Sequence, residues 1–231
     1  MRRWGILLVV LWVGGLAGCP SPAYRPAQPS TLQEAPGEVD TLQQQAMRGD
    51  AEAQYRLGIM AYTGEALPQQ AAEAVQWLRR AATQGHPEAQ RLLGRLYLAG
   101  QGIPRNEAEA VTWYRRAAEQ GDPEAQWQLG RLYSTGQGVP RNEAEAVTWY
   151  RRAAEQGDPE FQWQLGLKCL HGLGVPLDVV QAYLWLSLAV AHLPPGPLRY
   201  DATRASHRAA QQMTPAQWAR ARALLSQWPP Q

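Results

Sequence analysis

The chain of 231 residues lacks the short motifs around which many enzyme active sites are built. It contains no Ser-x-x-Lys, no Gly-x-Ser-x-Gly and no phosphate-binding P-loop. Its histidines do not share helical spacing with another histidine, a cysteine or a carboxylate in the way that a metal site needs. These histidines are His86, His171, His192 and His207. We therefore expect no catalysis, no cofactor and no bound metal.

The chain also lacks an excess of charge of one sign. It has 22 Lys and Arg against 20 Asp and Glu, and removal of Arg2 and Arg3 with an N-terminal signal leaves 20 against 20. A formally neutral body offers no electrostatic reason to bind nucleic acid or an anionic surface. Aromatic composition is lopsided, with 10 Trp and 1 Phe.

What the sequence does contain is a long internal repeat. The segment Pro104–Glu124, PRNEAEAVTWYRRAAEQGDPE, recurs without change at Pro140–Glu160, 36 residues later. The same step connects four tryptophans, which are Trp77, Trp113, Trp149 and Trp185. A period of about 20 to 50 residues is typical of a solenoid, in which each unit packs only on its neighbours. The two middle units are near-copies, and the outer two diverge, as terminal repeats with one face in water should.

One repeat, Gly121–Gly157, has the pattern of two antiparallel helices. Asp122 is a good N-cap for the first helix, and Gly136 supplies the left-handed residue that ends it. Asn142 and Glu145 have the spacing of a capping box that opens the second helix. The expected fold class is therefore all-α, with helix pairs repeating every 36 residues.

Small residues in the repeat indicate close packing within each pair. Gly130, Ala146 and Ala153 are expected to let the two helix backbones approach each other, and Trp149 is expected to fill the space between units.

This pattern resembles the Sel1-like repeat, a relative of the tetratricopeptide repeat. The third unit carries the signature at Ala125, Leu129, Gly130, Tyr133, Gly136, Gly138, Val139, Ala146, Trp149, Ala153, Ala154 and Gly157. Ala61 and Cys169 stand where the family has an aromatic residue. The resemblance covers about residues 46–192. It implies an α/α superhelix used as a protein-interaction scaffold, and it implies no particular partner.

Residues 1–18 have the pattern of a lipoprotein signal peptide. A charged start precedes the short apolar segment Trp4–Val13, which is too brief for a membrane span of about 20 residues. The following Leu16-Ala17-Gly18-Cys19 resembles the lipobox of bacterial lipoproteins. That resemblance implies cleavage before Cys19 and acylation of its sulfur and its new amine. The alternative is an ordinary signal peptide with a chance cysteine.

The remaining organisation follows from these boundaries. Residues 19–37 are expected to be the lipidated cysteine and a proline-rich tether, 38–192 an N-terminal half repeat with four repeats, and 193–231 capping helices. With Cys19 committed to lipid, Cys169 is left alone and is expected to be a buried, unreactive thiol. No aspartate follows Cys19, which favours the outer membrane, facing the periplasm, over the inner membrane.

The exposed face of each first helix is the predicted partner-binding surface. At about 100° per residue, two positions in each first helix point away from its apolar side, and in helix-pair solenoids this face lines the concave groove. The predicted groove residues are Tyr55, Ile59, Arg91, Arg95, Trp127, Arg131, Trp163 and Leu167. Aromatic and arginine side chains are enriched in interface hot spots. The alternative is that Trp127 and Trp163 pack against the neighbouring repeat.

Two functions are compatible with these features. The first is a lipid-anchored scaffold of the cell envelope that binds a protein or peptide in the groove and has no active site. The second is a carbohydrate-interacting accessory protein of polysaccharide export or cell-wall machinery, because aromatic faces stack on sugars as readily as on peptides. The second rests on analogy with Sel1-like lipoproteins of export systems.

Overall fold

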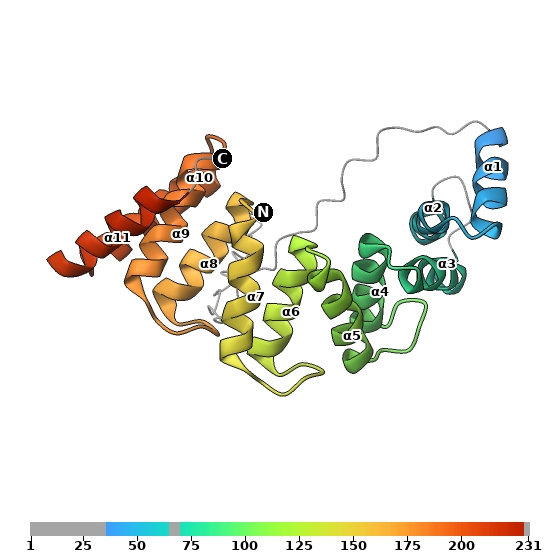
Figure 1. The fold of residues 1–231 in the computed structure, drawn as a ribbon, viewed down its shortest axis with the longest axis horizontal. Coiled ribbons are helices and arrows are strands. Elements are labelled where there is room, and N and C mark those ends of the chain that lie inside the picture. The colour runs from blue at the N-terminus through green and yellow to red at the C-terminus, as the bar shows by residue number, and fades with distance from the viewer. Residues whose placement is uncertain (1–35, 65–69, 229–231) are drawn as a thin grey trace, which may run out of the picture. The chain divides into compact units, whose positions relative to one another are not determined.

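The computed structural model describes residues 36–64 and 70–228, and within these ranges it is all-helical (Figure 1). The helices are α1 (Pro36–Met47), α2 (Ala51–Thr63), α3 (Ala71–Thr83), α4 (Pro87–Ala99), α5 (Glu107–Glu119), α6 (Pro123–Thr135), α7 (Glu143–Glu155), α8 (Pro159–His171), α9 (Val179–His192), α10 (Pro197–Gln211) and α11 (Pro215–Gln227). None of these helices combines the length and the apolar character needed to cross a membrane. The predicted signal peptide and Cys19 lie outside the described residues.

Helices α2 to α9 form four consecutive pairs. The first helix of each pair packs against its second helix, as α4 does against α5, and the second helix packs against the first helix of the next pair. Figure 1 shows these pairs following one another along the chain. The helical solenoid predicted from the 36-residue step is confirmed.

The predicted helix ends are confirmed in the third repeat, with one correction. The Asp122 carboxylate accepts from the Ala125 N–H at 2.7 Å, and Gly136 ends α6 with φ of 75°. Asn142 caps α7, but the predicted capping box is incomplete. The Asn142 N–H donates instead to the Tyr133 carbonyl at 2.9 Å. A capping box would need this same N–H to donate to the Glu145 side chain. The bond to Tyr133 instead ties the end of the loop between α6 and α7 back onto α6.

Close packing within a pair depends on the small residues that the sequence singled out. A Cβ added at Gly130 would lie 2.8 Å from the Tyr150 ring, so α6 and α7 could not keep their present separation with any other residue there. Ala146 and Ala153 are fully buried in the same contact. Trp149 is 7% exposed and belongs to an apolar cluster that extends from the first repeat to the third, so it fills space between units as predicted.

The last two helices both pack on α9. The Trp218 ring of α11 meets Tyr183 with 4.9 Å between centroids, and Trp228 meets Trp185 at 5.1 Å. A complete capping box opens α11, where Thr214 and Gln217 exchange hydrogen bonds between side chain and backbone. The C-terminal helices thus cover apolar rings of the final repeat.

Candidate partner-binding face

The predicted groove residues form two rows along the first helices α2, α4, α6 and α8. We call Tyr55, Arg91, Trp127 and Trp163 the junction row, and Ile59, Arg95, Arg131 and Leu167 the face row. Members of each row are 36 residues apart, and each row contributes one side chain per first helix.

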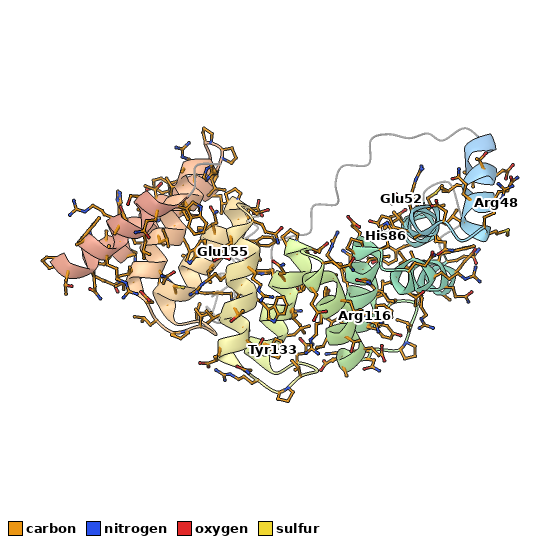
Figure 2. The ribbon with its side chains drawn as sticks, in the orientation of Figure 1. Arg48, Glu52, His86, Arg116, Tyr133 and Glu155 are labelled. Atoms are coloured by element: carbon orange, nitrogen blue, oxygen red, sulfur yellow. The ribbon has the colours of Figure 1, made fainter. Side chains whose placement is uncertain are left out.

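The junction row connects each first helix to the start of the next one. Tyr55 stacks on His86, the N-cap of α4, with ring centroids 4.5 Å apart. The His86 Nδ1 accepts from the Ala89 N–H at 3.3 Å, which leaves Nε2 to donate to Glu52 at 2.9 Å. Figure 2 shows Glu52 and His86 at this junction. One position later in the row, the Arg91 Nε donates to Asp122, the N-cap of α6, at 2.9 Å.

Trp127 is a packing residue rather than an exposed groove residue. Its side chain is 3% exposed, and its ring lies between Tyr150 at 4.5 Å and Phe161 at 5.2 Å, measured between centroids. Phe161 is the single phenylalanine of the chain and occupies the position of an alanine in the other first helices, which are Ala53, Ala89 and Ala125. The larger ring of the fourth repeat therefore covers Trp127.

Trp163 also packs toward the C-terminal end of the repeats. It is half-buried and lies against the cluster of Ala189, Leu193 and Ala202. Ala202 belongs to α10, which takes the place that the first helix of a further repeat would have. Its indole N–H is buried without a hydrogen-bond partner among the described residues. For both tryptophans the structure shows the contact between neighbouring units that was the alternative to the groove.

The face row is half-buried throughout, and its two arginines lie in a polar cluster on α4 and α6. Arg131 donates from Nε to Gln128 at 3.0 Å and from Nη1 to Gln137 at 3.4 Å. Gln128 in turn donates to Glu124 at 2.7 Å. The Arg95 guanidinium lies over the Tyr62 ring, 5.8 Å from its centroid. We call Arg91, Arg95, Arg131, Asp122, Glu124 and Gln128 the arginine cluster. It holds three guanidinium groups against two carboxylates.

The pKa of Glu124, one of the two carboxyl groups of the cluster, is shifted by its surroundings. Burial raises the pKa of Glu124, while the hydrogen bond from Gln128 and the positive charge of Arg91 act in the opposite direction. Arg131 donates these two hydrogen bonds to the oxygens of neutral amides, which do not offset its positive charge. The cluster therefore presents a local positive charge on a chain whose total charge is close to balanced.

The four repeats are also joined by a buried ladder of glutamines that the sequence analysis missed. The ladder residues are Gln54, Gln90, Gln126 and Gln162, each at most 6% exposed. Each donates its amide N–H to a carbonyl of the preceding second helix, as Gln126 does to Ala118 at 3.0 Å. Each of the first three accepts from a glutamine at the end of the next second helix, as Gln126 does from Gln156 at 2.9 Å. Their 36-residue spacing was a visible signal.

The ladder ends in the fourth repeat. The side-chain oxygen of Gln162 is buried without a hydrogen-bond partner among the described residues. The position that would supply the partner is His192, whose ring contacts the Leu188 carbonyl instead. In residues 36–64 and 70–228, no three His, Cys, Asp or Glu side chains gather closely enough to hold a metal ion.

Comparison with known proteins places this geometry in context. The family profile described as Sel1 repeat matches residues 51–86, 87–122, 123–158 and 159–192, which is more than half of the chain. The crystal structure of c5321, a protective antigen present in uropathogenic Escherichia coli strains and displaying an SLR fold, is similar with 40% identity and a TM-score of 0.63. That match covers 68% of this chain and 33% of c5321, so the chain spans about a third of that protein.

A second solved structure covers a smaller part of this chain. The Sel1 repeat protein from Oxalobacter formigenes is 41% identical with a TM-score of 0.52, and the match covers 55% of this chain and 96% of that protein. No curated protein matches the chain.

Proposed function

We propose that this chain, which belongs to the Sel1-repeat family, is a lipid-anchored scaffold that binds a protein or peptide partner through the exposed part of its first helices. Sel1-repeat solenoids are typically protein-interaction scaffolds, and proteins of the family are generally non-catalytic. A cell-envelope location, at the outer membrane and facing the periplasm, is part of the proposal.

The arginine cluster is the observation that carries the proposal. Arg95 and Arg131 lie on successive first helices, are half-buried, and are held by neighbouring aromatic or amide groups. A guanidinium that is already positioned loses less side-chain entropy on binding, and arginine forms strong, planar bonds to carboxylates. The cluster thus suits a partner segment that carries carboxylate groups. Because Trp127 is buried, we expect these arginines, and not the Trp127 ring, to make the main contacts with the partner.

Capture of partners from detergent-solubilised envelope tests this assignment. The double variant Arg95→Ala/Arg131→Ala is expected to lose about ten-fold or more of the captured partner relative to wild type. Arg105→Ala/Arg141→Ala is the matched control, because it removes the same charge from two exposed loop arginines. Circular dichroism should show that both variants fold. Equal capture by the two variants would contradict the assignment of the arginine cluster.

The lipid anchor has its own support and its own test. Leu16-Ala17-Gly18-Cys19 has the pattern of a lipobox. Two or more acyl chains make membrane attachment stable, since each buried methylene contributes about 0.8 kcal/mol. Metabolic labelling with an alkyne fatty acid is expected to mark the wild type and Cys169→Ser but not Cys19→Ser. Fractionation of the labelled membranes then tests the outer-membrane location.

A second candidate function, carbohydrate binding, is favoured by a cavity at the C-terminal end of the repeats. The cavity has a volume of about 470 Å³ and lies among α9, α10 and α11. Its lining combines aromatic rings with hydroxyl and imidazole groups, including Tyr183, Ser187, Thr203, Ser206, His207 and Trp218. This size lies within the range of about 300 to 1,000 Å³ that is usual for small ligands.

Retention on purified envelope glycan distinguishes the two functions. If the cavity binds sugar, Trp218→Ala should abolish retention. Trp228→Ala, which changes a tryptophan that packs on Trp185 instead, should preserve it. Failure of the wild type to be retained would remove the carbohydrate candidate and leave the protein-binding one.

A further inference from the structure

The second and third repeats share an arginine–tyrosine bond that ties each first helix to the preceding second helix. The Arg79 guanidinium of α3 donates to the Tyr97 hydroxyl of α4 at 3.0 Å. The Arg115 guanidinium of α5 donates to the Tyr133 hydroxyl of α6 at 2.7 Å. Both pairs are separated by 18 residues and repeat with the 36-residue step. The tyrosine is thus a structural link between consecutive pairs.

The junction between the third and fourth repeats keeps the arginine and loses the tyrosine. Arg151 stands one period after Arg115, and Cys169 stands one period after Tyr133. Cysteine has no phenol ring to fill the space and no hydroxyl at its end to accept from the guanidinium. One period before Arg79 and Tyr97 stand Gln43 of α1 and Ala61 of α2. Among the four repeats, a retained arginine with a missing ring therefore occurs only at the junction of the third and fourth.

A cavity lies at this position, between the third and fourth repeats. It has a volume of about 120 Å³, is partly open, and has a largely apolar lining. Its walls include Val147 and Arg151 from α7, Leu165 and Cys169 from α8, and Trp185 from α9. An apolar cavity of about 150 Å³ engineered in another protein binds benzene. At about 120 Å³ the space is close to the size of one benzene ring, and because the cavity is partly open, a substituent on the ring can extend out of it.

We propose that this cavity binds a 4-hydroxyphenyl group, supplied as the tyrosine side chain of a partner protein. The ring occupies the space that Tyr97 and Tyr133 fill in the second and third repeats, and its hydroxyl accepts from Arg151 as theirs accept from Arg79 and Arg115. The partner tyrosine completes the repeating link in trans. The assignment of the ring to a partner protein rests on the proposed scaffold function, whereas ring binding itself does not.

The other polar groups of the cavity are compatible with this occupant. Asp178 caps α9, accepting from the Val180 N–H at 2.9 Å and from the Gln181 N–H at 3.0 Å. Its carboxylate is thereby held at the helix end. Burial raises the pKa of the Cys169 thiol to about 12, so the thiol stays protonated and serves as a small apolar wall.

Binding of p-cresol by the full chain carrying Cys19→Ser is the direct test. Isothermal titration is expected to show saturable binding at one site. Toluene, which lacks the hydroxyl, is expected to bind about five-fold more weakly, and Arg151→Met should remove that preference. Cys169→Tyr should abolish p-cresol binding, because its own ring fills the cavity. If Cys169→Tyr does not fold, Cys169→Leu fills most of the same space and should also abolish binding.

A matched variant is expected to create a second site of the same kind at the preceding junction between repeats. Tyr133→Cys removes the ring opposite Arg115 and is expected to raise the number of p-cresol sites from one to two. Absence of saturable binding by the parent protein, or unchanged binding by the cavity-filling variants, would overturn the proposal.

A second ligand separates a partner side chain from a free phenol. N-acetyl-tyrosinamide is expected to compete with p-cresol, because the cavity is partly open and leaves room for the backbone to emerge. Binding of p-cresol without such competition would overturn the assignment to a protein side chain. Loss of partner capture by the Arg95→Ala/Arg131→Ala variant leaves p-cresol binding unaffected, so failure of the scaffold proposal and failure of this one are distinguishable.

Discussion

At the scale of single residues, the repeats are joined by polar side chains that are buried at the junctions. Gln126 bridges two second helices, because it donates to Ala118 in one and accepts from Gln156 in the other. A buried amide that keeps its partners contributes modestly to stability. The Ala118 carbonyl and the Gln156 amide each also bond to the Gly121 backbone, so the ladder adds one hydrogen bond to each of these groups.

Gln126→Leu is expected to lower the free energy of unfolding by about 1 to 2 kcal/mol, because it removes the hydrogen bond to the Ala118 carbonyl and the one from the Gln156 amide, each of which keeps a second bond to Gly121. Gln162→Leu should cost less, since the Gln162 oxygen has no partner to lose among the described residues. Urea denaturation followed by circular dichroism compares the two. Equal losses would show that the ladder contributes through packing alone.

Trp127→Ala is expected to lower the free energy of unfolding by about 3 to 5 kcal/mol, because it empties a buried site between Tyr150 and Phe161. Thermal denaturation and partner capture on the same preparation measure the effect. A small loss of stability together with a large loss of partner capture would contradict a packing role for Trp127.

Glu124→Gln tests the electrostatics of the arginine cluster. Because burial raises the pKa of Glu124 in the folded state above its ordinary value of 4.5, the folded state binds its proton more tightly than the unfolded state does. The wild type should therefore lose stability relative to Glu124→Gln as the pH rises from 4.5 through the raised pKa. Glu160→Gln, at the same position of the next first helix, is the exposed control. A wild-type advantage that grows with pH would contradict the raised pKa.

At the scale of elements, α9 has an unusual role because both C-terminal helices pack on it. Its Tyr183 and Trp185 side chains meet the two tryptophans Trp218 and Trp228 at the two ends of α11. In the repeats, a second helix is covered by the following pair. Here α11 covers α9 through aromatic contacts, so it shields the end of the last repeat from solvent.

A chain truncated after Gln212 is expected to exchange the amide hydrogens of α9 faster, because the rings of Tyr183 and Trp185 lose their cover. The amides of α2 to α5 should exchange at unchanged rates, since each pair of a solenoid contacts only its neighbours. Hydrogen exchange measured by mass spectrometry resolves the two regions. Uniformly faster exchange would show that the repeats unfold as a single cooperative unit.

At the scale of the whole molecule, each first helix meets its neighbours through the same positions, so the contacts are interchangeable between the middle repeats. Arg91 reaches the N-cap Asp122, and the corresponding aspartate one repeat later is Asp158. Gln90 accepts from Gln120, which corresponds to Gln156. Stability should therefore be close to a sum over repeats and junctions.

Deletion of residues 105–140 removes one period and joins Pro104 to Arg141, which restores the wild-type local sequence at the junction. The shortened chain is expected to fold, with Gln90 accepting from Gln156 and Arg91 donating to Asp158. Its thermal midpoint should be lower than that of the wild type, because one set of junction contacts is gone. Deletion of residues 105–132, which is not a whole period, is the control that should fail to fold cooperatively.

The sequence by itself determined the helix pairs, their order and their ends. These features depend on local chemistry, such as the Asp122 cap and the left-handed Gly136, and local signals repeat wherever the residues repeat. The repeat also determined where small residues such as Gly130 must lie.

Only the tertiary structure decided which side chains of the first helices are exposed. Helical periodicity gives the direction of Trp127 but not what stands opposite, and Phe161 from the next repeat covers it. The cavity beside Cys169 is likewise set by three helices together, since it is the absence of a ring at one position that leaves space among the others. Exposure and cavities belong to neighbouring elements jointly, whereas caps and periods belong to one stretch of chain.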